Sequence, residues 1–181
     1  MAKPLKCRTV ILPNQIRTRM EMRKQFRAPW DLLLIIMTTF IVGLLLGLNY
    51  LYPSQSIIPS IISWSIILFC AAFGIYGFSI QNGMLRILRL GWSKDISLSD
   101  IKSVEYKPNA MMGSLRTWGI GGVFGYIGHF KNRILGNYKA YATHRRKTVV
   151  ILTNNNEQIV ITPDDPELFV QTLRDEAKVA V

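Results

Sequence analysis

Residues 32–48 read LLLIIMTTFIVGLLLGL and contain no charged side chain. With Asn49–Tyr52 the stretch reaches the roughly 20 residues that a helix needs to cross the ~30 Å hydrocarbon core of a bilayer. A second uncharged block, IIPSIISWSIILFCAAFGIYGFSI, covers Ile57–Ile80 after the short polar link Pro53–Ser56. These patterns predict a transmembrane α-hairpin over residues 31–80.

The charge distribution predicts how this hairpin is oriented. Segment 1–30 has Glu21 as its only acidic residue, and its basic residues are Lys3, Lys6, Arg8, Arg17, Arg19, Arg23, Lys24 and Arg27. Positively charged flanks stay on the cytoplasmic side, so both termini are expected in the cytoplasm. The first block starts too late for a cleaved signal peptide and lacks an A-x-A cleavage site.

Gly43 and Gly47 form a GxxxG pattern within the first block. Two missing side chains on one helix face let another helix approach closely, which suggests dimerisation. Two other interpretations stay open. The glycines pack on Ala71, Ala72 and Gly74 within the same hairpin, or they reflect the high glycine content of membrane helices.

Downstream of Gln81 the apolar residues alternate with polar ones, as in β-strands. Met84–Leu90, Lys102–Lys107 and Thr148–Leu152 are typical strands, and Gln81–Gly83 and Thr153–Glu157 supply turn residues. The second of these turns joins VVIL to QIVIT as a hairpin. An antiparallel meander is expected.

The last predicted element is a helix over Glu167–Lys178, preceded by the capping sequence Thr162–Pro166. Asp164 and Asp165 fit a helix N-terminus better than a catalytic pair. The fold class predicted for residues 81–181 is therefore α+β, an antiparallel sheet of about six or seven strands with one C-terminal capping helix.

Three pieces of this region carry a resemblance to a known family: Gly122–Gly128 (GVFGYIG), Leu135–Thr143 (LGNYKAYAT) and Ile161–Phe169 (ITPDDPELF). Over Gly91–Leu173 the chain resembles bacterial pleckstrin-homology-like (PH-like) membrane proteins. The resemblance implies a PH-like antiparallel β-barrel or sandwich with a terminal helix. Such domains serve mainly as binding scaffolds, and their fold leaves the ligand undetermined.

The net charge of +11 fits two polyanions, nucleic acid and the lipid of the cytoplasmic leaflet. The two apolar blocks favour lipid over nucleic acid, and a Lys or Arg close to an anionic leaflet gains about 1 kcal/mol. The candidate lipid-binding or partner-binding residues are Lys131, Arg133, Arg145, Arg146, Lys147 and Trp118. The alternative is that these cations form a solvated face that keeps the domain soluble.

Phe124, Tyr126 and Phe130 alternate with glycines in the same region. They fit either insertion at a membrane interface or burial in the barrel, with the glycines permitting bends or bulges. The second interpretation agrees better with the usual role of aromatic side chains in cores.

Enzymatic and cofactor-dependent functions find no support in the sequence. Cys7 and Cys70 form no CxxC pair, and His129 and His144 lack partners at ligand spacing. The run Gly119–Gly122 has Phe124 where a dinucleotide-binding loop needs glycine. No catalytic residue, metal or cofactor is therefore expected.

These observations predict a nonenzymatic protein of the bacterial inner membrane, whose cytoplasmic domain binds a protein partner, its own copies or anionic phospholipid headgroups. The alternative is an accessory or regulatory subunit of a larger membrane transporter or membrane enzyme, with the hairpin as docking helices.

Overall fold

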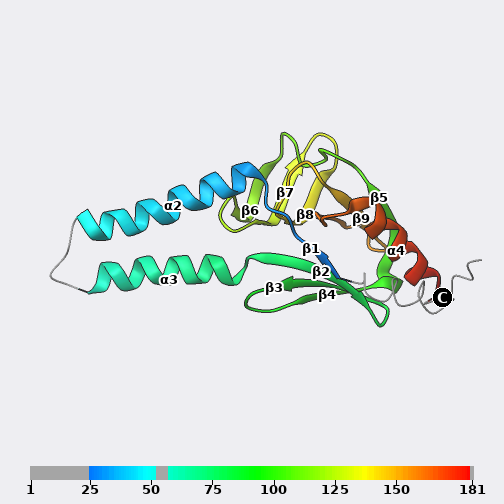
Figure 1. The fold of residues 1–181 in the computed structure, drawn as a ribbon. Helices are drawn as coiled ribbons and strands as arrows, with labels where there is room; N and C mark the ends of the chain where they lie inside the picture. Colours follow the sequence, from blue (N-terminus) through cyan, green and yellow to red (C-terminus); the bar gives the residue numbers. More distant parts are fainter. Residues whose placement is uncertain (1–24, 52–56, 180–181) are drawn as a thin grey trace, which may run out of the picture.

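The computed structural model describes residues 25–51 and 57–179 (Figure 1). Two helices, α2 (Leu32–Leu51) and α3 (Ile58–Ala72), run side by side and extend from one end of a β domain. We call that end, where α2 begins and α3 stops, the helix-proximal end. Helix α4 (Pro166–Val179) lies at the opposite end.

The β domain consists of two sheets. The first has the order β1-β2-β3-β4, with β1 (Gln25–Arg27), β2 (Ile75–Gln81), β3 (Met84–Arg89) and β4 (Lys94–Ser97). The second has the order β5-β9-β10-β8-β7-β6, with β5 (Ile101–Tyr106), β6 (Leu115–Gly121), β7 (Tyr126–Asn132), β8 (Gly136–Ala142), β9 (Val149–Thr153) and β10 (Gln158–Ile161). The short 3₁₀ turn η1 (Leu98–Asp100) joins the sheets.

Most predicted elements of the β domain are confirmed, with one correction to the topology. The strands around Met84, Lys102 and Thr148 form, and the turn after Thr153 closes the β9–β10 hairpin. The expected antiparallel meander is wrong at β10, which pairs parallel to β8. The reason is that the chain leaves β8 for β9, beside β5, and the returning β10 fills the place between β9 and β8.

The predicted second helix is too long, because α3 ends at Ala72 and residues 75–81 form β2. Ile75, Phe78 and Ile80 are buried in the core. A strand buried in this way reads as a continuous apolar run, which periodicity alone does not distinguish from a helix. The β domain therefore begins before residue 81, and β1 pairs with β2 although the two helices separate them in sequence.

The core lies between the two sheets and is closed by α4. The rings of Phe26 and Phe78 contact the ring of Phe169, with centroid distances of 4.9 and 6.2 Å. Asp165 caps α4, since its side chain accepts a hydrogen bond from the Leu168 N–H at 3.1 Å. The predicted capping role of this residue is confirmed.

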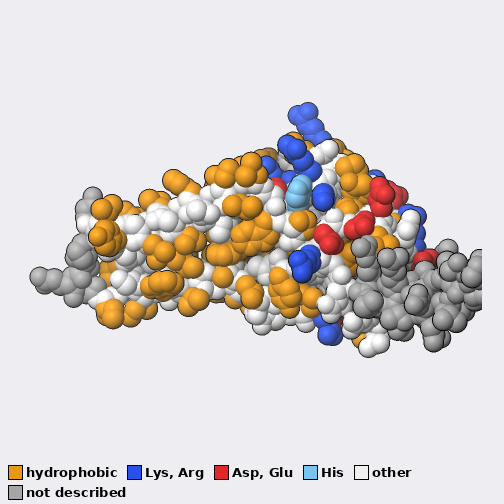
Figure 2. Space-filling view, viewed as in Figure 1, with side chains coloured by type: hydrophobic (Ala, Val, Ile, Leu, Met, Phe, Trp, Pro, Cys, Tyr) orange, Lys and Arg blue, Asp and Glu red, His pale blue; other side chains and the backbone are white. Residues whose placement is uncertain are grey.

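Polar side chains join α2 to α3 near their far ends. The Asn49 amide donates to the Ser63 hydroxyl at 2.8 Å, and the Ser60 hydroxyl donates to the Asn49 carbonyl oxygen at 3.0 Å. These bonds link the two helices directly, in surroundings without charge (Figure 2).

Gly119 and Gly128 face each other across the β6–β7 pair. Both have positive φ, +112° and +130°, and a Cβ on Gly119 would lie 2.2 Å from the Ile127 carbonyl oxygen. Only glycine permits this backbone approach together with this conformation.

We predict that Gly119→Ala lowers the free energy of unfolding by about 3 kcal/mol or more, through backbone strain and the carbonyl clash. Gly122→Ala is the matched control, because Gly122 has a similar φ of +99° but an added Cβ there would have no atom within 4 Å. Gly122→Ala should lower the free energy of unfolding by about 1 kcal/mol. Circular dichroism on heating measures both losses, and equal losses would contradict the contact argument.

Candidate functional site

Asp31 is the residue on which α2 begins. Its carboxylate accepts a hydrogen bond from the Leu34 N–H at 2.7 Å, the usual position for an N-cap. The side chain is buried against the β domain, so this carboxylate also needs partners from elsewhere in the chain.

Arg145, in the loop after β8, supplies those partners. Its backbone N–H and its Nε both donate to the second carboxylate oxygen of Asp31, at 3.2 and 3.3 Å. Backbone bonds reinforce the contact, since the Asp31 N–H donates to the Thr143 carbonyl at 3.0 Å and the Thr143 hydroxyl donates to the Pro29 carbonyl at 2.8 Å. Together these groups form what we call the Asp31 joint, which fixes the start of α2 to the loop between β8 and β9.

Two neutral side chains complete the surroundings of the joint. The Tyr126 hydroxyl donates to Asp31 at 3.5 Å, and burial together with the nearby carboxylate raises the pKa of Tyr126 to about 12. Burial also lowers the pKa of His144, whose Nδ1 accepts from the backbone N–H groups of Arg146 and Lys147. Both side chains are therefore uncharged near neutral pH.

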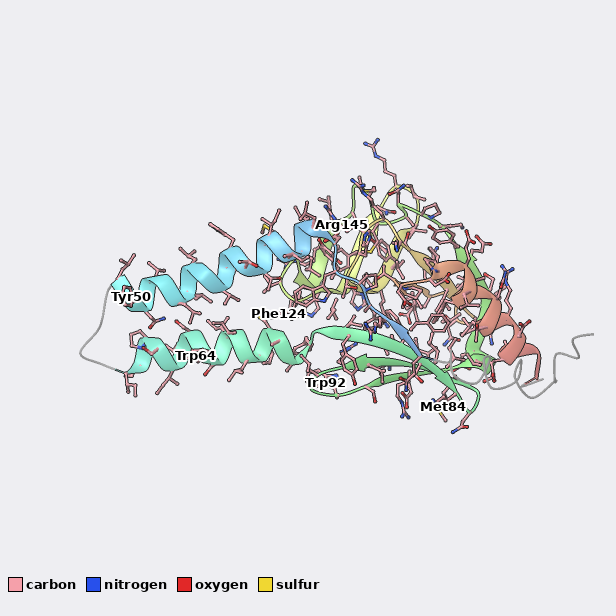
Figure 3. The ribbon with its side chains drawn as sticks, in the orientation of Figure 1. Tyr50, Trp64, Met84, Trp92, Phe124 and Arg145 are labelled. Atoms are coloured by element: carbon pink, nitrogen blue, oxygen red, sulfur yellow. The ribbon has the colours of Figure 1, made fainter. Side chains whose placement is uncertain are left out.

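Phe124 lies at the tip of the β6–β7 hairpin, between the start of α2 and the end of α3 (Figure 3). Its N–H donates to the Thr38 hydroxyl at 3.1 Å, and its ring packs edge-on against Trp30 with centroids 6.0 Å apart. A Cβ added to Gly74 would lie 3.7 Å from the Phe124 Cβ. The tip therefore holds both helices, with Phe124 in a left-handed conformation at φ +56°.

Strand β6 is an edge strand at the helix-proximal end of the domain (Figure 1). Its side chains are exposed on both faces: Trp118 is 78% exposed and Leu115 76%, and Ile134 in the neighbouring turn is 69% exposed. The exposed cations Arg116, Lys131 and Arg133 lie on the same hairpin or turn. We call this mixture of apolar and basic side chains the β6–β7 edge.

The structure divides the predicted binding residues into two groups. Trp118, Lys131 and Arg133 come together on the β6–β7 edge. Arg145 lies apart from them in the joint with Asp31 and is less available to a ligand, because its charge is already paired. Arg146 and Lys147 are exposed in the same loop, and the Lys147 ammonium donates to the Asp164 carbonyl at 3.3 Å.

The sequence interpretation did not single out Asp31, although an Asp directly before an apolar helix is an N-cap signal. The interpretation of the aromatic residues is confirmed for Tyr126 and Phe130, which are buried in the domain. It is wrong for Phe124, which packs on the helices instead. The glycines do accompany an irregularity, since the β6–β7 register shifts between Arg116 and Trp118.

Gly43 and Gly47 do not pack within the hairpin. A Cβ on either residue would have nothing within 4 Å, and the neighbours of Gly74 are Ala71 and Phe124. The interpretation that these glycines contact Ala71, Ala72 and Gly74 is therefore wrong. Their face of α2 is left uncovered by the described part of the chain.

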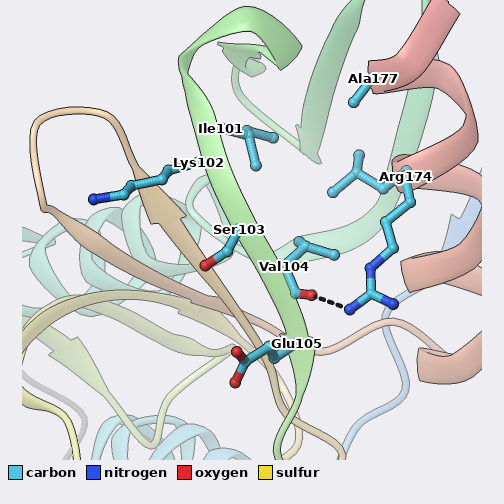
Figure 4. Close-up of a pocket in the computed structure, with 8 residues that line it drawn as sticks. Ile101, Lys102, Ser103, Val104, Glu105, Arg174 and Ala177 are labelled. Atoms are coloured by element: carbon cyan, nitrogen blue, oxygen red, sulfur yellow. Dashed lines mark hydrogen bonds between the residues drawn. The ribbon is translucent and has the colours of Figure 1, made fainter.

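A groove of about 320 Å³ lies between β5 and α4 (Figure 4), and no residue of α2 or α3 lines it. Arg174 crosses it and donates to the Val104 carbonyl at 2.8 Å. The only acid that lines it is Glu105, whose pKa is lowered by its hydrogen bond and ion pair with Lys107. Residues 25–51 and 57–179 contain no group of His, Cys, Asp or Glu that could hold a metal ion.

We predict that Asp31→Ala lowers the free energy of unfolding by about 2 to 3 kcal/mol, because the cap of α2 and the partner of Arg145 are lost together. Asp95→Ala is the control: it removes a carboxylate whose side chain is 37% exposed and pairs with Arg86 on the surface, so its loss should be clearly smaller than that of Asp31→Ala. Thermal unfolding of both variants under the same conditions measures the difference. A loss no larger for Asp31→Ala than for Asp95→Ala would refute the joint.

Comparison with known families gives a match to bacterial PH domains over residues 76–177, more than half of the 181-residue chain. The match begins inside β2 and ends inside α4, so it covers the β domain without β1 and the two long helices. Comparisons with curated proteins and with solved structures gave no significant match. The two sheets, the closing C-terminal helix and this match agree, and the chain therefore belongs to the bacterial PH domain family.

Proposed function

We propose that this chain is a nonenzymatic integral protein of the bacterial cytoplasmic membrane, with its PH-like domain as a binding module at the inner surface. The observation that carries the proposal is the apolar, uncharged surface of α2 and α3. Leu32 is 73% exposed and Phe40 and Leu68 are each 64% exposed, and Figure 2 has no charged side chain over the helix pair. A bilayer removes such a surface from water. A helix can cross it because its backbone N–H and C=O groups are hydrogen-bonded within the helix.

The lengths of the helices support this placement. Helix α2 has 20 apolar or uncharged residues, about 30 Å at 1.5 Å per residue. Only Leu34 and Thr38 among them are buried, unlike the residues of a core helix in a soluble protein. Helix α3 has 15 residues, about 22 Å at 1.5 Å per residue, and by itself is shorter than the ~30 Å hydrocarbon core of a bilayer. Aromatic side chains of the helix-proximal end, Phe73, Trp92 and Phe124, extend its apolar surface toward the headgroups.

PH-type domains are generally binding modules without catalytic activity. Because the proposed anchor holds this domain beside the bilayer, we expect its ligand to bind on the surface that faces the bilayer. The β6–β7 edge is our candidate, because its rings suit the interface and its cations suit anionic phospholipid headgroups. The basic segment before α2 supports a cytoplasmic location for both termini.

A second candidate function is that of an accessory subunit of a transporter or membrane enzyme, or of a homo-oligomer. The observation that favours it is the uncovered face at Gly43 and Gly47, where another transmembrane helix has room to approach. The Ser63 hydroxyl is less available for such a contact, since it already bonds to Asn49 within the hairpin.

We predict that the full-length protein stays in the membrane pellet after alkaline carbonate extraction. A tag at either end should be accessible to protease only after spheroplasts are broken, because both termini are cytoplasmic. A soluble protein after extraction, or a tag digested in intact spheroplasts, would overturn the anchor and its orientation.

A separate prediction concerns the β6–β7 edge. In a reconstituted variant with Trp118 as the only tryptophan, brominated phosphatidylglycerol should quench Trp118 fluorescence. Reversing Lys131 to Glu should weaken the contact by a few-fold to about tenfold, at about 1 kcal/mol per basic residue. Lys102→Glu makes the same charge change on β5, the strand at the opposite edge of the same sheet, and should leave quenching unchanged. Quenching that is absent, or equal in both variants, would refute this surface.

A further inference from the structure

Arg89 is the last residue of β3 and is half-buried. Its Nε is fully buried and has no hydrogen-bond partner among the described residues. Within residues 25–51 and 57–179 its guanidinium forms no ion pair, whereas Arg86 three residues earlier bonds to both carboxylate oxygens of Asp95 at 2.8 and 3.0 Å. A buried N–H group without an acceptor is unfavourable, so the side chain of Arg89 requires an explanation.

Aromatic rings hold the guanidinium of Arg89. Its Cζ lies 4.9 Å from the ring centroid of Tyr141 and 6.0 Å from that of Trp92. Cation–π contacts use the face of the guanidinium plane and leave the N–H groups at its edge to bind an acceptor. An arginine held in this way is preorganised for the paired oxygens of a phosphate or carboxylate.

The surroundings place this arginine at the end of α3. The backbone N–H groups of Leu90 and Gly91 donate to the carbonyls of Gly74 and Ala72, at 3.2 and 2.9 Å. The ring of Trp92 packs on Phe73 with centroids 4.5 Å apart. Because backbone N–H groups already bond to the last carbonyls of α3, Arg89 is not needed as the cap of that helix.

We propose that Arg89 binds the phosphate of an anionic phospholipid headgroup where α3 leaves the bilayer. The inference rests on the proposed membrane anchor, which sets the end of α3 at the headgroup level. Leu90, 70% exposed, and Trp92, 47% exposed, flank the arginine and contact the upper acyl chains and the interface of the same lipid. The site is separate from the β6–β7 edge and uses one half-buried arginine held by aromatic rings instead of several exposed cations.

The test uses full-length protein in a mild detergent, with lipid binding followed by native mass spectrometry. Wild type should bind phosphatidylglycerol at least tenfold more tightly than phosphatidylcholine. Arg89→Gln should lose about tenfold or more in affinity for phosphatidylglycerol, as expected for a charge-assisted pair of hydrogen bonds. Arg86→Gln is the matched control, because it makes the same charge change in the same strand, and it should bind as wild type does. Millimolar inorganic phosphate should not displace the lipid.

Four results would overturn the site: no preference of wild type for phosphatidylglycerol, equal affinities of Arg89→Gln and wild type, an equal loss in Arg86→Gln, or displacement by inorganic phosphate. If Arg89→Gln fails to fold, Arg89→Lys decides instead. It keeps the charge but loses the planar fork, and should bind severalfold more weakly than wild type. Carbonate extraction of Arg89→Gln separates the two proposals, since the anchor should persist when the lipid site is lost.

Discussion

The arrangement of helices and β domain depends on the carboxylate of Asp31. This one group caps α2, accepts two hydrogen bonds from Arg145 and faces the hydroxyl of Tyr126. A carboxylate withdrawn from water is stable only when its acceptor sites are filled, so the start of α2 and the loop after β8 have to stay in register. The positive end of the helix dipole adds to the same attraction.

Phe124 complements the Asp31 joint from the side of the β6–β7 hairpin. The joint ties α2 to the loop between β8 and β9, and the hairpin tip contacts Thr38 on α2 and approaches Gly74 just after α3. The two contacts together hold a pair of helices that bond to each other near their far ends. The helices are therefore connected to the domain at two places, one of which is the tip of the hairpin that carries the β6–β7 edge.

Local sequence patterns predicted the parts of the fold that depend on local interactions. The strands from Met84 onward, the β9–β10 turn and the capped C-terminal helix follow from alternation, turn residues and N-cap chemistry. Strand β2 could not be separated from α3, because both are uncharged and apolar and the difference lies in what covers them. Strand β1, Gln25–Arg27, is too short to carry a periodic signal and exists because β2 pairs with it. The parallel pairing of β10 with β8 is likewise a tertiary property.

The candidate sites show the same limit. Counting basic residues singled out Lys131, Arg133 and Arg145 alike, but could not show that the charge of Arg145 is already paired. It also gave no reason to single out Arg89, which is distinguished by having no carboxylate partner among the described residues and by the ring of Tyr141 from β8. Pairing and burial of a charge depend on distant residues, which a single sequence does not bring together.

The insertion of both helices between β1 and β2 has a consequence for biosynthesis. Strand β1 leaves the ribosome before the hairpin, yet its partner is made only after the second helix, and three residues cannot form a stable strand alone. The first sheet is therefore completed only after both helices and β2 have been synthesised. Folding of the helix pair and closing of this sheet are therefore coupled, because the two helices have to return the chain to the place where β2 meets β1.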